Sequence, residues 1–145
     1  MEMASILLVD DETAFLDAMK RRLSKRGFKV ETAESGMSAL ELLEDKHNSI
    51  EVVVLDVKMP GIDGIDSLRE IKRKFPMVEV VMLTGHATVG SAIEGMKLGA
   101  FDYLMKPCNM DRLMEIVKEA ARKKRNHEEK IREARVKELL STRGF

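Results

Sequence analysis

The sequence is poor in cysteine, tryptophan and proline, with one Cys, no Trp and three Pro in 145 residues. Because Cys108 stands alone, the chain cannot close an intramolecular disulfide or build a paired-thiol metal site, and nothing points to an oxidising compartment. The aromatic residues are five Phe and one Tyr. Base-stacking platforms of the kind used by single-strand nucleic-acid binders are therefore not expected.

Long apolar runs are missing as well. Near the N-terminus the longest run is Ile6 to Val9, which is too short for a signal peptide or a membrane span. The length of 145 residues and the hydrophobic share of 44% suit one compact domain rather than two. We expect a soluble cytoplasmic protein with no membrane partner.

The charge is balanced overall but unevenly distributed. The 25 basic and 25 acidic residues argue against a chain that holds nucleic acid through its overall charge, and no nucleic-acid partner is predicted. Residues 121–145 carry nine Lys or Arg against four Asp or Glu, a net charge of +5, which leaves −5 for residues 1–120. The sequence thus predicts an acidic domain over 1–120 and a basic extension over 121–145.

Short apolar runs alternate with longer stretches of helical period, which is typical of a parallel sheet with crossover helices. The first, third and fourth runs are almost continuously apolar, which predicts central strands, whereas the second and fifth alternate and are expected at the edges. The predicted strands are Ser5 to Val9, Phe28 to Thr32, Val52 to Leu55, Glu79 to Leu83 and Phe101 to Leu104.

The predicted helices differ in their N-cap residues and in their glycine content. Ser35 and Asp63 stand where N-caps of the second and third helices belong. The fourth helix, between residues 88 and 98, contains Gly90 and Gly95, each of which costs about 1 kcal/mol relative to Ala. The glycines predict either the least rigid helix of the domain or a helix that packs closely on the sheet.

Polar side chains follow the ends of four predicted strands, and parallel sheets of this kind bind ligands beyond the carboxyl ends of their strands. As central neighbours, the first and third strands would bring three of these side chains, all carboxylates, together. Each residue alone also has a structural explanation, such as helix capping, but their joint placement favours a site. The residues are Asp10, Asp11, Asp56, Thr84 and Lys106.

Three crowded carboxylates repel each other, so the site calls for positive charge. Lys106 offsets one negative charge, and a divalent cation would offset the rest. Oxygen ligands suit Mg²⁺ better than Zn²⁺. Together with the Thr84 hydroxyl, such a site is equipped to bind phosphoryl oxygens, and an Asp can itself act as the nucleophile that forms an aspartyl phosphate.

These motifs resemble the receiver domain of two-component response regulators over about residues 4–120. The stretch GHATVGSAIEGMKLGAFDYLMKP is similar to receivers of the nitrogen-regulation class. The resemblance implies a flavodoxin-like, doubly wound α/β fold with strand order 2-1-3-4-5, and a cis Lys106-Pro107 peptide. The motifs are Asp10-Asp11, Asp56 within LDVKMPGIDG, Thr84-Gly85 and Lys106-Pro107.

The resemblance also implies a role for each residue of the site. Asp56 would accept a phosphoryl group from a sensor histidine kinase or a phosphotransfer protein. Mg²⁺ would be bound by Asp11, Asp56 and the backbone carbonyl of Lys58, with Asp10 acting through a water. Thr84 would hydrogen-bond the phosphoryl group. The domain would thus catalyse its own phosphotransfer and dephosphorylation, although its main role is signalling.

The resemblance also implies how a change at the site would reach a protein-binding surface. Lys106 would pair with a phosphoryl oxygen. Tyr103 occupies the aromatic switch position of the family. When Thr84 moves, Tyr103 would change its position and reshape the face formed by the fourth helix, fifth strand and fifth helix. That face would control a partner or output domain, or form a homodimer. Residues 121–145 are expected to continue the fifth helix as a solvated helix, a dimerising helix or a linker, and the resemblance favours the last two.

Two further residues bear on the lifetime of the phosphorylated state. In the family, the residues two positions after the phosphoacceptor and after the Thr influence how water reaches the acyl phosphate, and here they are Lys58 and His86. Neither is the carboxylate or amide best suited to orient an attacking water. A lifetime of minutes or more is therefore predicted.

Three other classes of protein share parts of this pattern. A haloacid-dehalogenase-type phosphatase needs a second Asp two residues after the nucleophile, where Lys58 stands. A flavodoxin-like flavin carrier needs a hydroxyl-rich or Gly-rich loop after the first strand, where Asp-Asp-Glu-Thr would repel a phosphate. An unphosphorylated adaptor that uses the receiver fold only to bind proteins remains the alternative.

Overall fold

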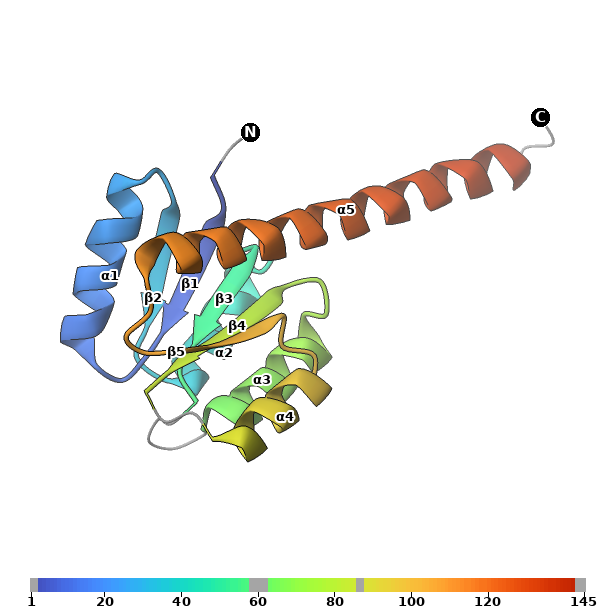
Figure 1. The fold of residues 1–145 in the computed structure, drawn as a ribbon. Coiled ribbons are helices and arrows are strands. Elements are labelled where there is room, and N and C mark those ends of the chain that lie inside the picture. Colours follow the sequence, from blue (N-terminus) through green and yellow to red (C-terminus); the bar gives the residue numbers. More distant parts are fainter. Residues whose placement is uncertain (1–2, 58–62, 86–87, 143–145) are drawn as a thin grey trace.

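The computed structural model describes residues 3–57, 63–85 and 88–142. Within these residues, five strands alternate with five helices along the chain, as Figure 1 shows. In chain order the elements are β1 Ser5–Val9, α1 Thr13–Lys25, β2 Lys29–Ala33, α2 Gly36–Lys46, β3 Val52–Leu55, α3 Gly64–Lys74, β4 Glu79–Thr84, α4 Val89–Lys97, β5 Asp102–Met105 and α5 Met110–Thr142.

The strands form one parallel sheet in the order β2-β1-β3-β4-β5, which confirms the predicted order, edges and centre. β2 begins one residue later than predicted. The Phe28 N–H donates to the Leu23 carbonyl at the end of α1, and pairing with the first strand starts with the Lys29 N–H, which donates to Ala4. The fifth strand is likewise shifted by one residue, to Asp102–Met105.

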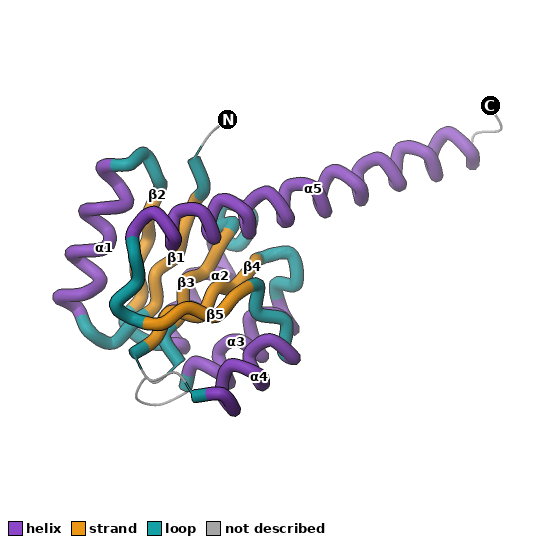
Figure 2. Tube along the Cα trace, in the orientation of Figure 1, coloured by secondary structure: helices purple, strands orange, loops and turns teal. Residues whose placement is uncertain are grey.

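Helices cover both faces of the sheet (Figure 2). Side chains of β1 alternate between the two faces: Ile6 and Leu8 pack in the cluster with α1 and α5, whereas Leu7 and Val9 pack in the cluster with α2 and α3. All four side chains are buried. A strand buried on both faces needs apolar residues at every position, which explains the continuous runs in the sequence.

The predicted helix caps are present. The Ser35 hydroxyl accepts a hydrogen bond from the Ser38 N–H, and the Asp63 carboxylate accepts one from the Asp66 N–H at 2.8 Å. α4 begins with a reciprocal capping box and buries only Gly95, which lies against Tyr103 and the sheet. A Cβ at this position would lie 3.7 Å from the Tyr103 side chain, an ordinary contact distance, so packing on the sheet does not require glycine here, and the lower rigidity of this helix stays a prediction.

The last helix has two parts with different surroundings. Its buried residues end at Lys124, and the part that follows projects beyond the sheet (Figure 1). This continuity confirms the predicted long C-terminal helix, while the domain boundary at residue 120 stays a prediction. None of the helices that the structure describes has an apolar stretch of the length needed to cross a membrane.

Candidate functional site

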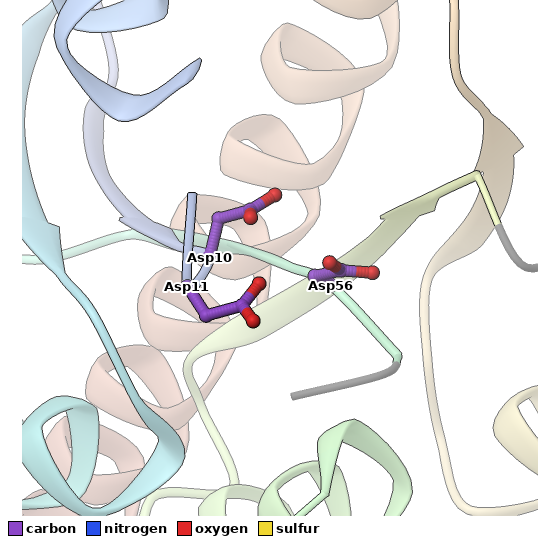
Figure 3. A group of neighbouring side chains, drawn as sticks. All are labelled: Asp10, Asp11 and Asp56. Atoms are coloured by element: carbon purple, nitrogen blue, oxygen red, sulfur yellow. The ribbon is translucent and has the colours of Figure 1, made fainter. Parts of the chain in front are cut away.

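Three carboxylates meet at the carboxyl end of the sheet. Asp10 follows β1 and Asp56 follows β3, its neighbour in the sheet, and Figure 3 shows these side chains together with that of Asp11. One carboxylate oxygen from each residue lies within 4.8 Å of the others. The predicted acidic cluster is therefore present.

The backbone holds the two buried carboxylates firmly. The Asp10 N–H donates to the Ala33 carbonyl at 3.2 Å, and the Asp56 N–H donates to the Val9 carbonyl at 3.0 Å, so hydrogen bonding between neighbouring chains continues past the strand ends. Asp10 is only 2% exposed and Asp56 only 4%, whereas Asp11 is exposed. Two carboxylates of the cluster are thus buried, and the third is open to solvent.

Lys106 supplies the cation that the sequence predicted. Its ammonium nitrogen lies 2.6 Å from Asp10 Oδ2 and 3.8 Å from Asp56 Oδ2. The side chain is 17% exposed, so its charge is poorly screened by water. One ammonium against three carboxylates leaves a surplus of negative charge, which favours binding of a further cation.

Thr84 lies at the same edge of the sheet. It ends β4, is fully buried, and its carbonyl accepts the Lys106 N–H at 2.9 Å. The Lys106-Pro107 peptide is cis, as the resemblance implied. The ends of β4 and β5 are therefore tied together beside the carboxylates.

Gly64 is a residue of the site that the sequence reading missed. Its N–H donates to the Val57 carbonyl at 2.7 Å, and a Cβ at this position would lie 2.1 Å from the Asp56 carbonyl oxygen. Only glycine permits this approach, so α3 can begin directly against the backbone that carries Asp56. The glycine-containing motif after Asp56 was visible in the sequence, but not the close approach that requires it.

Two side chains next to Lys106 were also missed. The Phe15 ring centroid lies 4.0 Å from the Lys106 ammonium nitrogen, and Glu12 Oε1 lies 3.9 Å from it. In the sequence, Phe15, Met19 and Leu23 recur every four residues, which is the spacing of a buried helix face, so the pattern alone indicates a core residue at Phe15. The available signal was its place in the first helical turn after the Asp pair.

Tyr103 lies on the α4 side of the site. It is half-buried in β5, and its hydroxyl is 2.8 Å from the Ser91 hydroxyl in the first turn of α4. Cys108 is a free, half-buried thiol, and burial raises the pKa of this thiol, which disfavours its reactive thiolate form. Lys58 and His86 lie outside the described residues.

The donor set fits a small divalent cation. Three carboxylates offer oxygen atoms close enough to share one ion, and no imidazole or thiolate belongs to the cluster that the described residues form. Mg²⁺ prefers such oxygen ligands and retains waters, which the exposed side of Asp11 permits. A buried carboxylate beside a cation site and an ammonium has the groups needed for phosphoryl transfer.

This fold and site define a class of signalling domain. The family model for the response regulator receiver domain matches residues 6–118, and the chain belongs to this family. The curated relative NtrC of Escherichia coli, a DNA-binding transcriptional regulator, is 34% identical over 120 residues, which cover 83% of this chain and 25% of the relative. The chain thus spans about a quarter of the length of the curated relatives it matches.

Solved structures agree with this assignment. A response regulator receiver domain protein from Clostridium thermocellum has a TM-score of 0.81 and 41% identity, with 85% of this chain and 98% of that chain covered. A response regulator from Burkholderia pseudomallei, solved with a phosphorylated aspartic acid, a calcium ion and citrate, has a TM-score of 0.74 and 26% identity, with coverages of 86% and 72%. The predicted family and fold are confirmed.

Proposed function

We propose that Asp56 accepts a phosphoryl group from a phosphohistidine on a sensor histidine kinase or phosphotransfer protein. A carboxylate oxygen of Asp56 attacks phosphorus, the P–N bond breaks, and the imidazole leaves with the bonding electron pair. The observation that carries this proposal is the cluster of three carboxylates with one ammonium at the carboxyl ends of β1, β3 and β5 in a receiver domain.

Asp11 and Asp56 would bind Mg²⁺ directly, and Asp10 would act through a water. The short distances among their oxygens and the exposure of Asp11 support this assignment. The backbone carbonyl of Lys58, which lies outside the described residues, would be a further ligand. Bound Mg²⁺ would neutralise the surplus charge and draw in phosphoryl oxygens. The Burkholderia pseudomallei relative, with its calcium ion and phosphorylated aspartic acid, is consistent with this arrangement.

Lys106 and Thr84 would bind the transferred group. The ammonium already lies 3.8 Å from Asp56, so a short movement brings it to an oxygen on the phosphorus. The Thr84 hydroxyl would donate a hydrogen bond to another oxygen. Both interactions place positive charge or a donor where negative charge accumulates.

Tyr103 would couple the site to an output surface. Its hydroxyl contact with Ser91 reaches the first turn of α4, and Val89, Ile93 and Met96 form an exposed apolar stripe along that helix. A change at Thr84 that moves Tyr103 would therefore alter the face of α4, β5 and α5. This face would bind a partner, an output domain or a second copy of the chain.

Residues 121–145 would act as a connector or a dimerising helix. The described part of this segment is helical to Thr142, and Val136, Leu139 and Leu140 are exposed on it. Exposed apolar side chains on a projecting helix favour a partner helix over a purely solvated role.

The test is covalent labelling of Asp56. The purified chain is incubated with acetyl phosphate and Mg²⁺, and its intact mass is measured. We expect one phosphoryl adduct that is absent from Asp56→Asn and retained in Asp17→Asn, an exposed carboxylate on α1. An unmodified wild-type chain would refute the proposal and support the adaptor alternative.

The lifetime of the adduct is a separate prediction. Because Lys58 and His86 are poorly suited to orient an attacking water, the Mg²⁺-bound phosphoprotein should persist for minutes or more. The decay of the adduct after removal of acetyl phosphate measures this lifetime. A half-life of seconds would show that another group activates the water.

A further inference from the structure

The Lys106 ammonium is held on more than one side, and one of its neighbours is not a carboxylate. Asp10 accepts its hydrogen bond at 2.6 Å, while the Phe15 ring centroid lies 4.0 Å away. We propose that Phe15 is a positioning residue for Lys106, which sets the reach of the ammonium toward Asp56. This inference rests on the proposed function of Asp56.

The fold places the ring beside the site for a simple reason. α1 begins at Thr13, so Phe15 belongs to the first helical turn after the Asp10-Asp11 pair. Its ring is half-buried and packs against the apolar cluster between the sheet, α1 and α5. The position of the ring is therefore fixed by packing, and the ring can act as a wall for the more flexible Lys106 side chain.

An aromatic face attracts the ammonium without accepting a conventional hydrogen bond from it. The ring quadrupole is negative above its face, and the 4.0 Å separation lies well within the range of such contacts. An ammonium has three N–H donors, of which Asp10 accepts one. The remaining donors are left for Asp56 and for an oxygen on the phosphorus.

Without the ring, Asp10 would dominate the position of the ammonium. Asp56 Oδ2 is 3.8 Å from the nitrogen, too far for a hydrogen bond, whereas Asp10 Oδ2 is at 2.6 Å. The aromatic face offers a second attraction and shields one side of the ammonium from water. Phe15 thus limits the positions that Lys106 samples before phosphoryl transfer.

The kinetic test uses substitutions that keep apolar volume and remove the ring. Phe15→Leu, with Phe15→Met as a second ringless variant, should slow adduct formation at Asp56 from acetyl phosphate and Mg²⁺ about fivefold or more. Phe15→Tyr, which keeps an aromatic ring, should form the adduct at the wild-type rate. Phe101→Leu is the matched control, because its ring lies 5.7 Å from the Lys123 ammonium outside the site, and its rate should not change.

A double-mutant cycle separates positioning from a general effect on the fold. In the Lys106→Gln background, Phe15→Leu should cause no further loss of rate. The proposal is overturned if the ringless variants react at the wild-type rate, or if Phe15→Leu costs the same factor with and without Lys106.

A spectroscopic measurement distinguishes failure of this inference from failure of the proposed function. The ring current of Phe15 should shift the ε-methylene protons of Lys106 upfield in the NMR spectrum. The shift should persist in Phe15→Tyr and vanish in Phe15→Leu. A wild-type chain that forms no adduct would refute the proposed function, whereas the absence of the shift would refute the contact between ring and ammonium.

Discussion

At the carboxyl end of the sheet, the carboxylates of Asp10, Asp11 and Asp56 lie close together, and among the residues that the structure describes the Lys106 ammonium pairs with two of them, Asp10 and Asp56. At the amino end, by contrast, the half-buried Glu51 pairs with one described cation and the buried Glu79 with two. Both ends contain acidic side chains in well-packed surroundings. The difference lies in whether the protein itself supplies the compensating charge.

Glu51, just before β3, illustrates the amino end. Its carboxylate accepts hydrogen bonds from the Arg125 guanidinium, one of them at 2.7 Å, and from the Ser5 N–H at 3.2 Å. Burial alone would raise the pKa of Glu51, but these bonds together lower it below the ordinary value of 4.5. This ion pair attaches α5 to the start of the sheet.

Glu79, at the start of β4, is compensated from both faces of the sheet. Lys72 of α3 and Lys123 of α5 each place an ammonium 3.3 Å from one of its carboxylate oxygens. The ion pairs at the amino end therefore have a structural role: they attach α5 to the sheet near the point where this helix leaves the domain. At the carboxyl end one ammonium faces three carboxylates, and under the proposed function a bound divalent cation would supply the remaining positive charge.

The largest expected effect is at the carboxyl end. Gly64→Ala would force a Cβ to within 2.1 Å of the Asp56 carbonyl oxygen, and we expect a loss of about 3 kcal/mol or more in the free energy of unfolding. Urea denaturation measures the loss. Gly90→Ala is the control: its nearest neighbour would be 4.0 Å away, so a gain of about 0.5–1 kcal/mol is expected. Equal effects of the two substitutions would contradict the close approach.

A smaller effect is expected at the amino end. Glu51→Gln should lower the free energy of unfolding by about 1–2 kcal/mol at neutral pH without slowing modification of Asp56. Because the folded-state pKa of Glu51 is lowered, its stabilisation is present above the unfolded-state pKa and is lost as the pH falls through the folded-state value. Wild type and variant should thus converge in acid, as followed by urea denaturation. A slower adduct with unchanged stability would show that Glu51 serves the site instead.

Much of the fold was predictable from sequence because its three central strands are buried on both faces and its edge strands are not. The continuous run Val52–Leu55 and the alternating edge strands identified centre and edges correctly. The residues at which the strands begin and end were less predictable. The Phe28 N–H is used by the last turn of α1, a hydrogen bond that apolar patterning does not reveal.

The site was predictable where its residues follow strand ends and not where they come from helices. Asp10, Asp56 and Lys106 met as expected, because parallel strands end at a common edge. Phe15 stands at an apolar position of the helical repeat, which indicates a core residue. The contact of its ring with the Lys106 ammonium is visible only in the structure. Gly64 is required by a backbone approach that no side-chain pattern encodes.

Titration of the chain with Mg²⁺ in a calorimeter tests the contrast between the two ends most directly. We predict one bound ion per wild-type chain, strongly weakened binding in Asp11→Asn, and unchanged binding in Glu51→Gln. Binding that is absent from the wild type, or that survives Asp11→Asn at full strength, would contradict the claim that the carboxyl end is built around a divalent cation.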